Sequence, residues 1–263
     1  MQPTLVDPLP IADHAIPTHL AAFDEMLGTG GLPCGRILEL FGEPECGKTT
    51  FALNLVAAAQ QFGAKCVLVD AERTLDARWA EQCGVRTADL TVLRPDSGQQ
   101  AVVMIESLLR TFSVDFLVVD SAAALVPEEE LEASLEDAPE DLHLQFLTRS
   151  LRRISTIASR SRCAVLFLNQ ARSRFKEDGM ETSAGARALA QYAAIRIRMK
   201  AAAHIFESGR MTGRRVTLLT LKNKLGEPYA EAGFDLVNGR VRVVERKGVE
   251  SADTARRAAG LGR

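Results

Sequence analysis

Short hydrophobic runs rich in β-branched residues alternate with longer amphipathic stretches up to about residue 190. The short runs are apolar throughout, which is typical of parallel strands buried on both faces of a sheet. The predicted strands are 37–41, 66–69, 116–119 and 164–168, and the predicted helices are 48–62, 76–83, 98–110 and 142–161. This alternation predicts an α/β fold, a mostly parallel twisted sheet with helices on both faces.

The pattern changes after residue 190. Strand-like segments at 193–199, 215–221, 233–237 and 241–244 follow one another at short intervals. Asn238-Gly239 between the last two is a strong hairpin signal, so we expect antiparallel strands at the C-terminal end of the sheet. We expect three parts in the chain: an irregular, proline-punctuated lead-in at 1–13, one core at 14–244 and a flexible tail at 245–263.

Composition excludes several classes of protein. The 263 residues are 46% hydrophobic and 25% charged, which is typical of a globular chain. The five cysteines contain no C-x-x-C pair, so neither a disulfide framework nor a zinc site is indicated. We find no run of 18 apolar residues and no signal-peptide pattern, and therefore expect a cytoplasmic protein without a membrane partner. The net charge of −2 means that any contact with nucleic acid must come from a local basic patch.

The segment from residue 42 to residue 49 matches the phosphate-binding loop G-x-x-x-x-G-K-[ST], between a predicted strand and a predicted helix. Its backbone N–H groups and the helix N-terminus favour phosphate, Lys48 reaches the β- and γ-phosphates, and Thr49 offers a hydroxyl to Mg²⁺. We therefore predict ATP and Mg²⁺ as cofactors. The predicted loop residues are Gly42, Glu43, Pro44, Glu45, Cys46, Gly47, Lys48, Thr49 and Thr50.

Two further acidic residues stand at the ends of predicted strands. Asp120 follows the strand at 116–119 and is expected near the magnesium, although an Asp here also suits a cap for the next turn. Glu72 follows the strand at 66–69 and could orient the attacking water. From spacing alone, a surface Glu at a strand end is an equal alternative.

Five segments together resemble the RecA recombinase family, in order and approximate spacing, over about residues 14–244. The resemblance is carried by residues 28–37, 70–80, 119–127, 166–170 and 221–224. It implies a RecA-type ATPase core in which Glu72 is the general base and Gln170 senses the γ-phosphate. A small-molecule P-loop kinase would leave both of these residues unexplained.

The resemblance also assigns the adenine end of the site. Asp76 would contact the adenine and Trp79 would stack on it, in place of the family's tyrosine. Core packing within a helix is the alternative for Trp79. Asn238, beside Gly239, stands where a second aromatic residue would flank the base.

Lys222 and Lys224 resemble the two lysines that enter the ATP site of a neighbouring subunit. There they would supply positive charge to the transition state, as an arginine finger does. A solvated basic pair on a strand is the alternative. If the lysines act in trans, hydrolysis requires an interface with another copy of the chain or with a RecA-type subunit.

The DNA-facing parts depart from the family pattern. The loop at 171–187 keeps basic residues around one aromatic, which suits single-stranded DNA. By contrast, residues 128–141 are strongly acidic and should repel phosphate; we favour a solvated loop there over a docking face for a basic partner. Gln145 and Gln191 replace a family arginine and a relay phenylalanine. The predicted DNA-binding residues are Arg152, Arg172, Arg174, Phe175, Lys176, Gly185 and Arg187.

Two functions follow from the resemblance. One is a DNA-dependent ATPase of recombination, repair and the DNA-damage (SOS) response, with strand exchange left open. The other is an ATP-gated adaptor that binds other repair or translesion-synthesis proteins, as ImuA proteins do. Residues 1–13 are too few for the family's N-terminal element, and its C-terminal lobe has no counterpart, so we expect weak filament formation.

Overall fold

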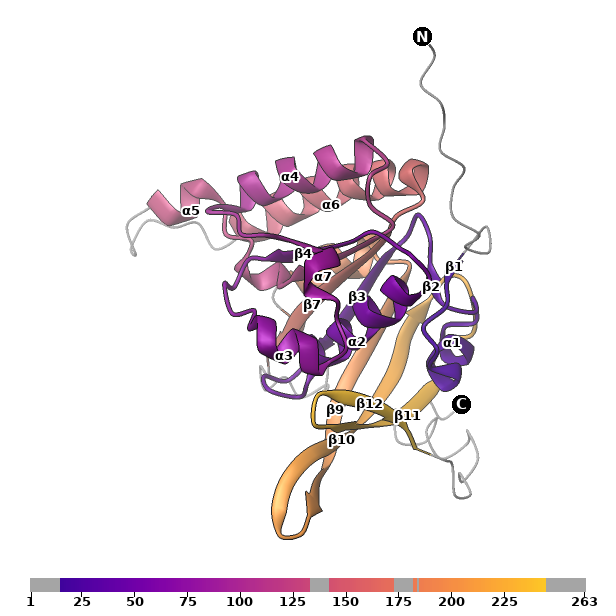
Figure 1. The fold of residues 1–263 in the computed structure, drawn as a ribbon. Helices are drawn as coiled ribbons and strands as arrows, with labels where there is room; N and C mark the ends of the chain where they lie inside the picture. Colours follow the sequence, from indigo (N-terminus) through magenta and orange to yellow (C-terminus); the bar gives the residue numbers. More distant parts are fainter. Residues whose placement is uncertain (1–14, 133–141, 173–181, 184, 245–263) are drawn as a thin grey trace.

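The computed structural model describes residues 15–132, 142–172, 182–183 and 185–244. Within this part, one large sheet has the strand order β12-β11-β10-β9-β3-β7-β6-β4-β5, and β8 pairs with β7 (Figure 1). Its strands are β3 (Ile37–Gly42), β4 (Cys66–Asp70), β5 (Leu90–Leu93), β6 (Phe116–Asp120), β7 (Ala164–Arg172), β8 (Thr182–Ser183), β9 (Ile195–Glu207), β10 (Arg210–Asn223), β11 (Glu231–Val237) and β12 (Arg240–Val243). A separate pair joins β1 (Ala15–Ile16) to β2 (Leu32–Pro33).

The strands from β9 through β3 to β5 are parallel, whereas β9 to β12 pair antiparallel. This confirms the predicted mostly parallel sheet with an antiparallel C-terminal end. The four predicted core strands and four predicted helices are all present, with small shifts at their ends. None of the described helices is long and apolar enough to cross a membrane.

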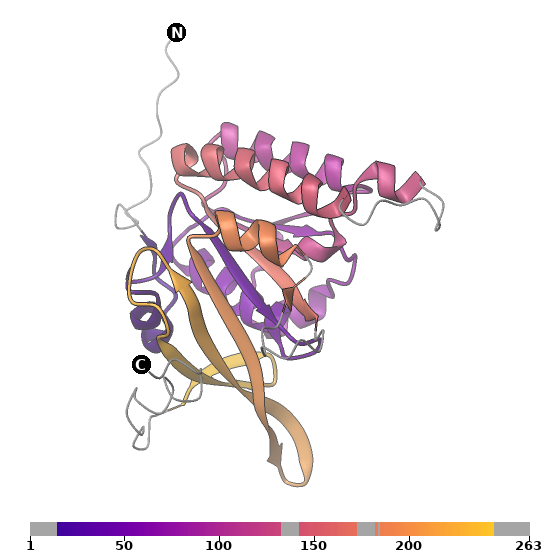
Figure 2. The same ribbon diagram turned by 180° about the vertical axis from the view of Figure 1, so that it is seen from behind.

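Helices cover both faces of the sheet because the side chains of each core strand alternate between two hydrophobic clusters. Leu38 and Leu40 of β3 pack with α2, whereas Ile37 packs with α4 and α6. The first face carries α1 (Ala21–Leu27), α2 (Lys48–Gln61) and α3 (Ala77–Gln82). The second carries α4 (Gly98–Arg110), α6 (Leu142–Ser161) and α7 (Ala186–Tyr192), with α5 (Glu128–Glu132) beside α6 (Figures 1 and 2).

The C-terminal strands differ from the prediction in one respect. The segments predicted at 193–199 and 215–221 belong to one long hairpin of β9 and β10, which projects from the body of the molecule (Figure 2). Its turn places Ser208 at φ +51° and Gly209 at φ +77°, as a tight two-residue hairpin requires. The residues approaching the turn are exposed, so no alternating apolar pattern marked them as strand. The predicted Asn238-Gly239 hairpin is confirmed, with φ values of +47° and +79°.

Candidate active site

One cavity of about 540 Å³ lies at the carboxyl ends of β3, β6 and β7. Strands β10 and β11, with the β11–β12 turn, close it from the antiparallel side of the sheet. Its size is within the range of small-molecule sites. The lining residues are Pro44, Glu45, Gly47, Lys48, Thr49, Thr50, Glu72, Trp79, Asp120, Ser121, Gln170, Met211, Thr212, Gly213, Arg214, Leu236, Asn238 and Gly239.

The phosphate loop joins β3 to α2, and glycine is required at both of its ends. A Cβ at Gly42 would lie 2.2 Å from the carbonyl oxygen of Met199 on the neighbouring strand β9. Gly47 has φ +103°, a conformation that side chains disfavour, and it caps the N-terminus of α2. The helix therefore presents free N–H groups and its positive dipole end to the cavity.

Lys48 is held across this loop. Its ammonium donates to the carbonyl oxygens of Gly42 at 3.1 Å and Glu43 at 2.7 Å, and lies 3.7 Å from the sulfur of Cys46. These three partners belong to the predicted loop but do not line the cavity. They place the ammonium where it can meet an anion bound at the helix N-terminus.

Thr49 and Asp120 meet although they are far apart in the chain. The hydroxyl of Thr49 donates to Oδ2 of Asp120 at 2.7 Å. Burial raises the pKa of Asp120 to about 6, the Thr49 hydrogen bond opposes this, and the charges of Glu72 and Asp70 add to it. Hard oxygen donors in a field of negative charge suit Mg²⁺. Magnesium is usually held by one or two protein oxygens plus substrate phosphates, and these two residues fit that pattern.

Glu72 lies beside this pair. Its backbone N–H donates to the carbonyl oxygen of Asp120 at 3.2 Å. Its carboxylate accepts hydrogen bonds from the hydroxyl of Ser121 and, at 3.3 Å, from the side-chain amide of Gln170. The structure thus brings together the predicted general base, the predicted γ-phosphate sensor and the predicted magnesium ligand. Ser121 was not predicted, although it directly follows Asp120 in the sequence.

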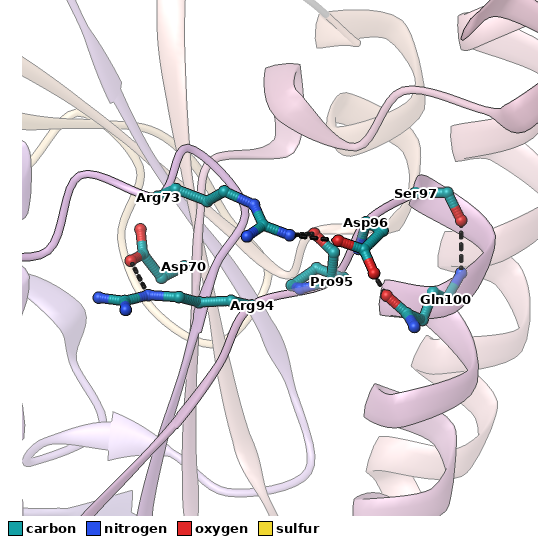
Figure 3. A network of polar contacts seen from close by, with 7 residues as sticks. All are labelled: Asp70, Arg73, Arg94, Pro95, Asp96, Ser97 and Gln100. Carbon is teal, nitrogen blue, oxygen red and sulfur yellow. Dashed lines mark hydrogen bonds and ion pairs between the residues drawn. The ribbon is translucent and has the colours of Figure 1, made fainter.

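Charged residues on both sides of Glu72 in the sequence contact the segment after β5 (Figure 3). Buried Asp70, at the end of β4, accepts from Nε of Arg94 at 3.1 Å. Arg73 forms an ion pair with Asp96, just before α4. These contacts tie the end of β4 to the segment after β5, so Glu72 projects from an anchored turn.

Trp79 also lines the cavity. Its indole N–H donates to the Thr50 hydroxyl at 3.2 Å, and the residue is 37% exposed. It is therefore available to a ligand, and the alternative of core packing does not describe it. The predicted adenine contact Asp76 is placed differently, because its carboxylate caps α3 through the N–H of Arg78 at 2.8 Å, and it does not line the cavity.

Four consecutive residues of β10, Met211 to Arg214, also line the cavity. The sequence did not indicate them, because they lie in the gap between two predicted strands. A guanidinium N–H of Arg214 donates to the carbonyl oxygen of Glu45 in the phosphate loop. The antiparallel end of the sheet thus contributes directly to the site.

Comparison with known proteins identifies the architecture. The RecA N-terminal domain family matches residues 10–242. The chain is similar to Protein RecA of Citrifermentans bemidjiense and of Geobacter sulfurreducens, each 40% identical over 227 residues, which are 86% of this chain and 67% of the relative. Protein RecA of Chloroflexus aurantiacus is 38% identical over 229 residues, 86% of this chain and 65% of the relative. The chain belongs to the RecA family. It spans about two thirds of the length of these relatives.

The two lysines that resemble the RecA family's trans-acting pair lie away from the chain's own cavity. Lys222 of β10 pairs with Arg196 of β9, and Arg196 pairs with Glu39 of β3. The phosphate loop starts three residues beyond Glu39, about 10 Å further along the strand direction. The Lys222 ammonium donates to the carbonyl oxygen of Ala190 in α7 at 2.5 Å. Burial lowers its pKa, and the nearby charges of Lys224 and Arg196 lower it further. Neither lysine lines the cavity.

The predicted DNA-binding residues of this RecA-family chain are only partly described. Ala171 and Arg172 of β7 pair with Ser183 and Thr182 of β8, so the two ends of the loop meet directly after Gln170. Arg174, Phe175 and Lys176 lie outside the described residues. Gly185 caps α7 at φ +66°, Arg187 is exposed on its first turn, and Arg152 is exposed on α6, which packs against α7.

Proposed function

We propose that this chain binds and hydrolyses ATP in DNA recombination and repair, and that it contacts single-stranded DNA through the loop at 171–187. Membership of the RecA family supports the general role. The observation that carries the proposal is the convergence on one cavity of the phosphate loop, the Thr49–Asp120 pair and the Glu72–Gln170 contact.

Different residues of the cavity would contact different parts of the nucleotide. The phosphates would lie at the N-terminus of α2, with Lys48 near the terminal ones. The adenine would stack on Trp79, and Asn238 and Gly239 also line the cavity. Thr49 and Asp120 would hold Mg²⁺, which when bound neutralises charge on the phosphates.

Hydrolysis needs an attacking water on the γ-phosphate side of the cavity. Glu72 would orient this water and accept its proton as the new P–O bond forms and the bond to the β-phosphate oxygen breaks. Gln170 links that carboxylate to the loop that follows β7. Its side-chain amide donates to Glu72, and the next two residues of β7 pair with β8. The γ-phosphate state would thereby reach the DNA-facing loop.

A second subunit would complete the site. Lys222 and Lys224 would enter the cavity of a neighbouring copy, or of a RecA-type subunit, and supply charge to the transition state. Their distance from the chain's own cavity supports this arrangement.

An ATP-gated adaptor for repair or translesion-synthesis proteins is the second candidate. The acidic helix α5 favours it, because Glu128 and Glu129 are anchored to Ser97 and Gln99 at the start of α4 and hold an acidic face in place. Such a face suits a basic protein partner better than DNA.

ATP hydrolysis by the purified protein, with and without single-stranded DNA, tests the proposal. Lys48→Ala serves as the blank. We expect DNA to stimulate hydrolysis, and Arg172→Ala/Arg174→Ala to reduce the stimulation and the salt dependence of DNA binding. A rate of hydrolysis that DNA does not change would favour the adaptor function. Absence of ATP binding by the wild type would refute both candidate functions.

A further inference from the structure

Strand β10 carries two adjacent arginines on opposite faces of the sheet, because side chains alternate along a strand. Arg215 forms a paired contact with Asp235 of β11, at 2.7 and 2.9 Å from the two carboxylate oxygens, and is exposed. Arg214 lines the cavity and donates to the carbonyl oxygen of Glu45. Only the second of these arginines meets the nucleotide cavity.

Arg214 lies over the N-terminus of α2. A Cβ placed on Gly47, which caps this helix, would be 3.9 Å from Cδ of Arg214. Burial raises the pKa of Cys46 in the same loop, and the charges of Lys48 and Arg214 oppose that rise. The guanidinium and the ammonium therefore act on the same few residues of the loop, and both add to the positive helix end.

The position of Arg214 limits which part of a bound nucleotide it can contact. Thr49, Glu72 and Gln170 lie together where the terminal phosphate would bind, whereas Trp79 would stack on the base. Arg214 instead contacts Glu45 and lies near Gly47, in the middle of the loop that would hold the phosphates. One of its five N–H donors serves the Glu45 carbonyl, and the fork geometry of guanidinium suits a phosphate next to it.

We propose that Arg214 is a phosphate-binding residue of this site, contacting the non-terminal phosphates of a nucleotide bound to the same chain. This rests on the proposed function, since it requires a nucleotide in the cavity. Arg214 acts in cis and retains its contact after the γ-phosphate leaves, so it strengthens the binding of ADP as well as ATP. It also joins the β9–β10 hairpin to the bound nucleotide.

Nucleotide titrations of single variants test this assignment. Trp79 is the chain's one tryptophan and lines the cavity, so its fluorescence reports binding of Mg-ATP and Mg-ADP without a label. Arg214→Ala should lower the affinity for both nucleotides by about 10-fold or more, because losing a charged hydrogen bond usually costs this much. Arg215→Ala is the matched control and should stay within about 2-fold, because exposed ion pairs contribute little.

Arg214→Gln separates phosphate binding from support of the loop. Glutamine can still donate to the Glu45 carbonyl but carries no charge. We expect it to lose affinity as Arg214→Ala does, and both variants to show a shallower dependence of affinity on salt than the wild type.

Three results would overturn the assignment while leaving the proposed function standing. These are wild-type affinity in Arg214→Gln, an unchanged salt dependence in both variants, or an equal effect of Arg215→Ala. Thermal melts of the ligand-free variants check that each is folded. A wild-type protein that binds neither nucleotide would instead refute the proposed function itself.

Discussion

Single residues set opposite charges on the two sides of the cavity. Lys48 lies at the phosphate loop, whereas Asp120 and Glu72 lie together at the ends of β6 and β4. Asp120 is 7% exposed, so its carboxylate loses water on folding, and the hydrogen bond that it accepts from Thr49 comes from a neutral hydroxyl. Burial, with the charge of Glu72, therefore raises the pKa of Asp120 to about 6.

Asp120→Asn should stabilise the nucleotide-free protein at neutral pH. When the pKa of a carboxyl is higher in the folded than in the unfolded chain, the free energy of unfolding falls as the pH rises between the two values. For Asp120 this range runs from about 4 to about 6. The amide does not ionise, so this loss of stability is absent in the variant. We therefore expect the variant to have a higher Tm than the wild type at pH 7, and the two Tm values to converge near pH 4. Thermal unfolding across this pH range measures it.

The same substitution should weaken the effect of Mg²⁺ on ATP binding, because an amide oxygen carries no charge for the cation. A Tm at pH 7 equal to or below that of the wild type would contradict the account of Asp120.

Three strands are joined beneath the phosphate loop by a buried charged group. Glu39 of β3 is fully buried and accepts from the amide of Asn169 on β7 at 2.9 Å and from Nε of Arg196 on β9 at 2.5 Å. The Arg196 guanidinium also lies 5.0 Å from the ring centre of Phe41. Asn169 immediately precedes Gln170, so this group helps to set the strand that carries the predicted sensor.

Glu39→Ala should destabilise the protein by about 3 kcal/mol or more, because it leaves the charge of Arg196 buried without its partner. Asp235→Ala, which breaks the exposed pair with Arg215, is the matched control and should change stability by less than about 1 kcal/mol. Urea unfolding of the two variants makes the comparison. Equal effects would show that the buried group does not hold the three strands together.

Elements with a strong local signal were predictable. Apolar runs marked the core strands, the glycine pattern marked the phosphate loop at 42–49, and Asn238-Gly239 marked a hairpin. The outer part of the β9–β10 hairpin was not predictable, because its exposed strands carry no period-two pattern. The contact of Arg214 with Glu45 joins residues 169 positions apart through the pairing of β10 with β9 and of β9 with β3, which no local pattern encodes.

At the scale of the whole molecule, the cavity and the two lysines lie apart in the sheet. Gln170 and the cavity lie at the carboxyl ends of the parallel strands, whereas Lys222 lies level with Glu39, beside α7. Lys222 and Lys224 therefore lie outside the cavity of their own chain. In the proposed function, ATP is hydrolysed where the cavity of one subunit meets the lysines of its neighbour.

Mixing two defective variants tests this claim most directly. Glu72→Gln removes the base but leaves the lysines, and Lys222→Ala/Lys224→Ala removes the lysines but leaves the base. The account predicts that each alone hydrolyses ATP far below the wild type. An equal mixture should recover about a quarter of the wild-type rate, because one interface in four pairs an intact base with intact lysines. A mixture no more active than its two components, or a lysine variant as active as the wild type, would contradict it.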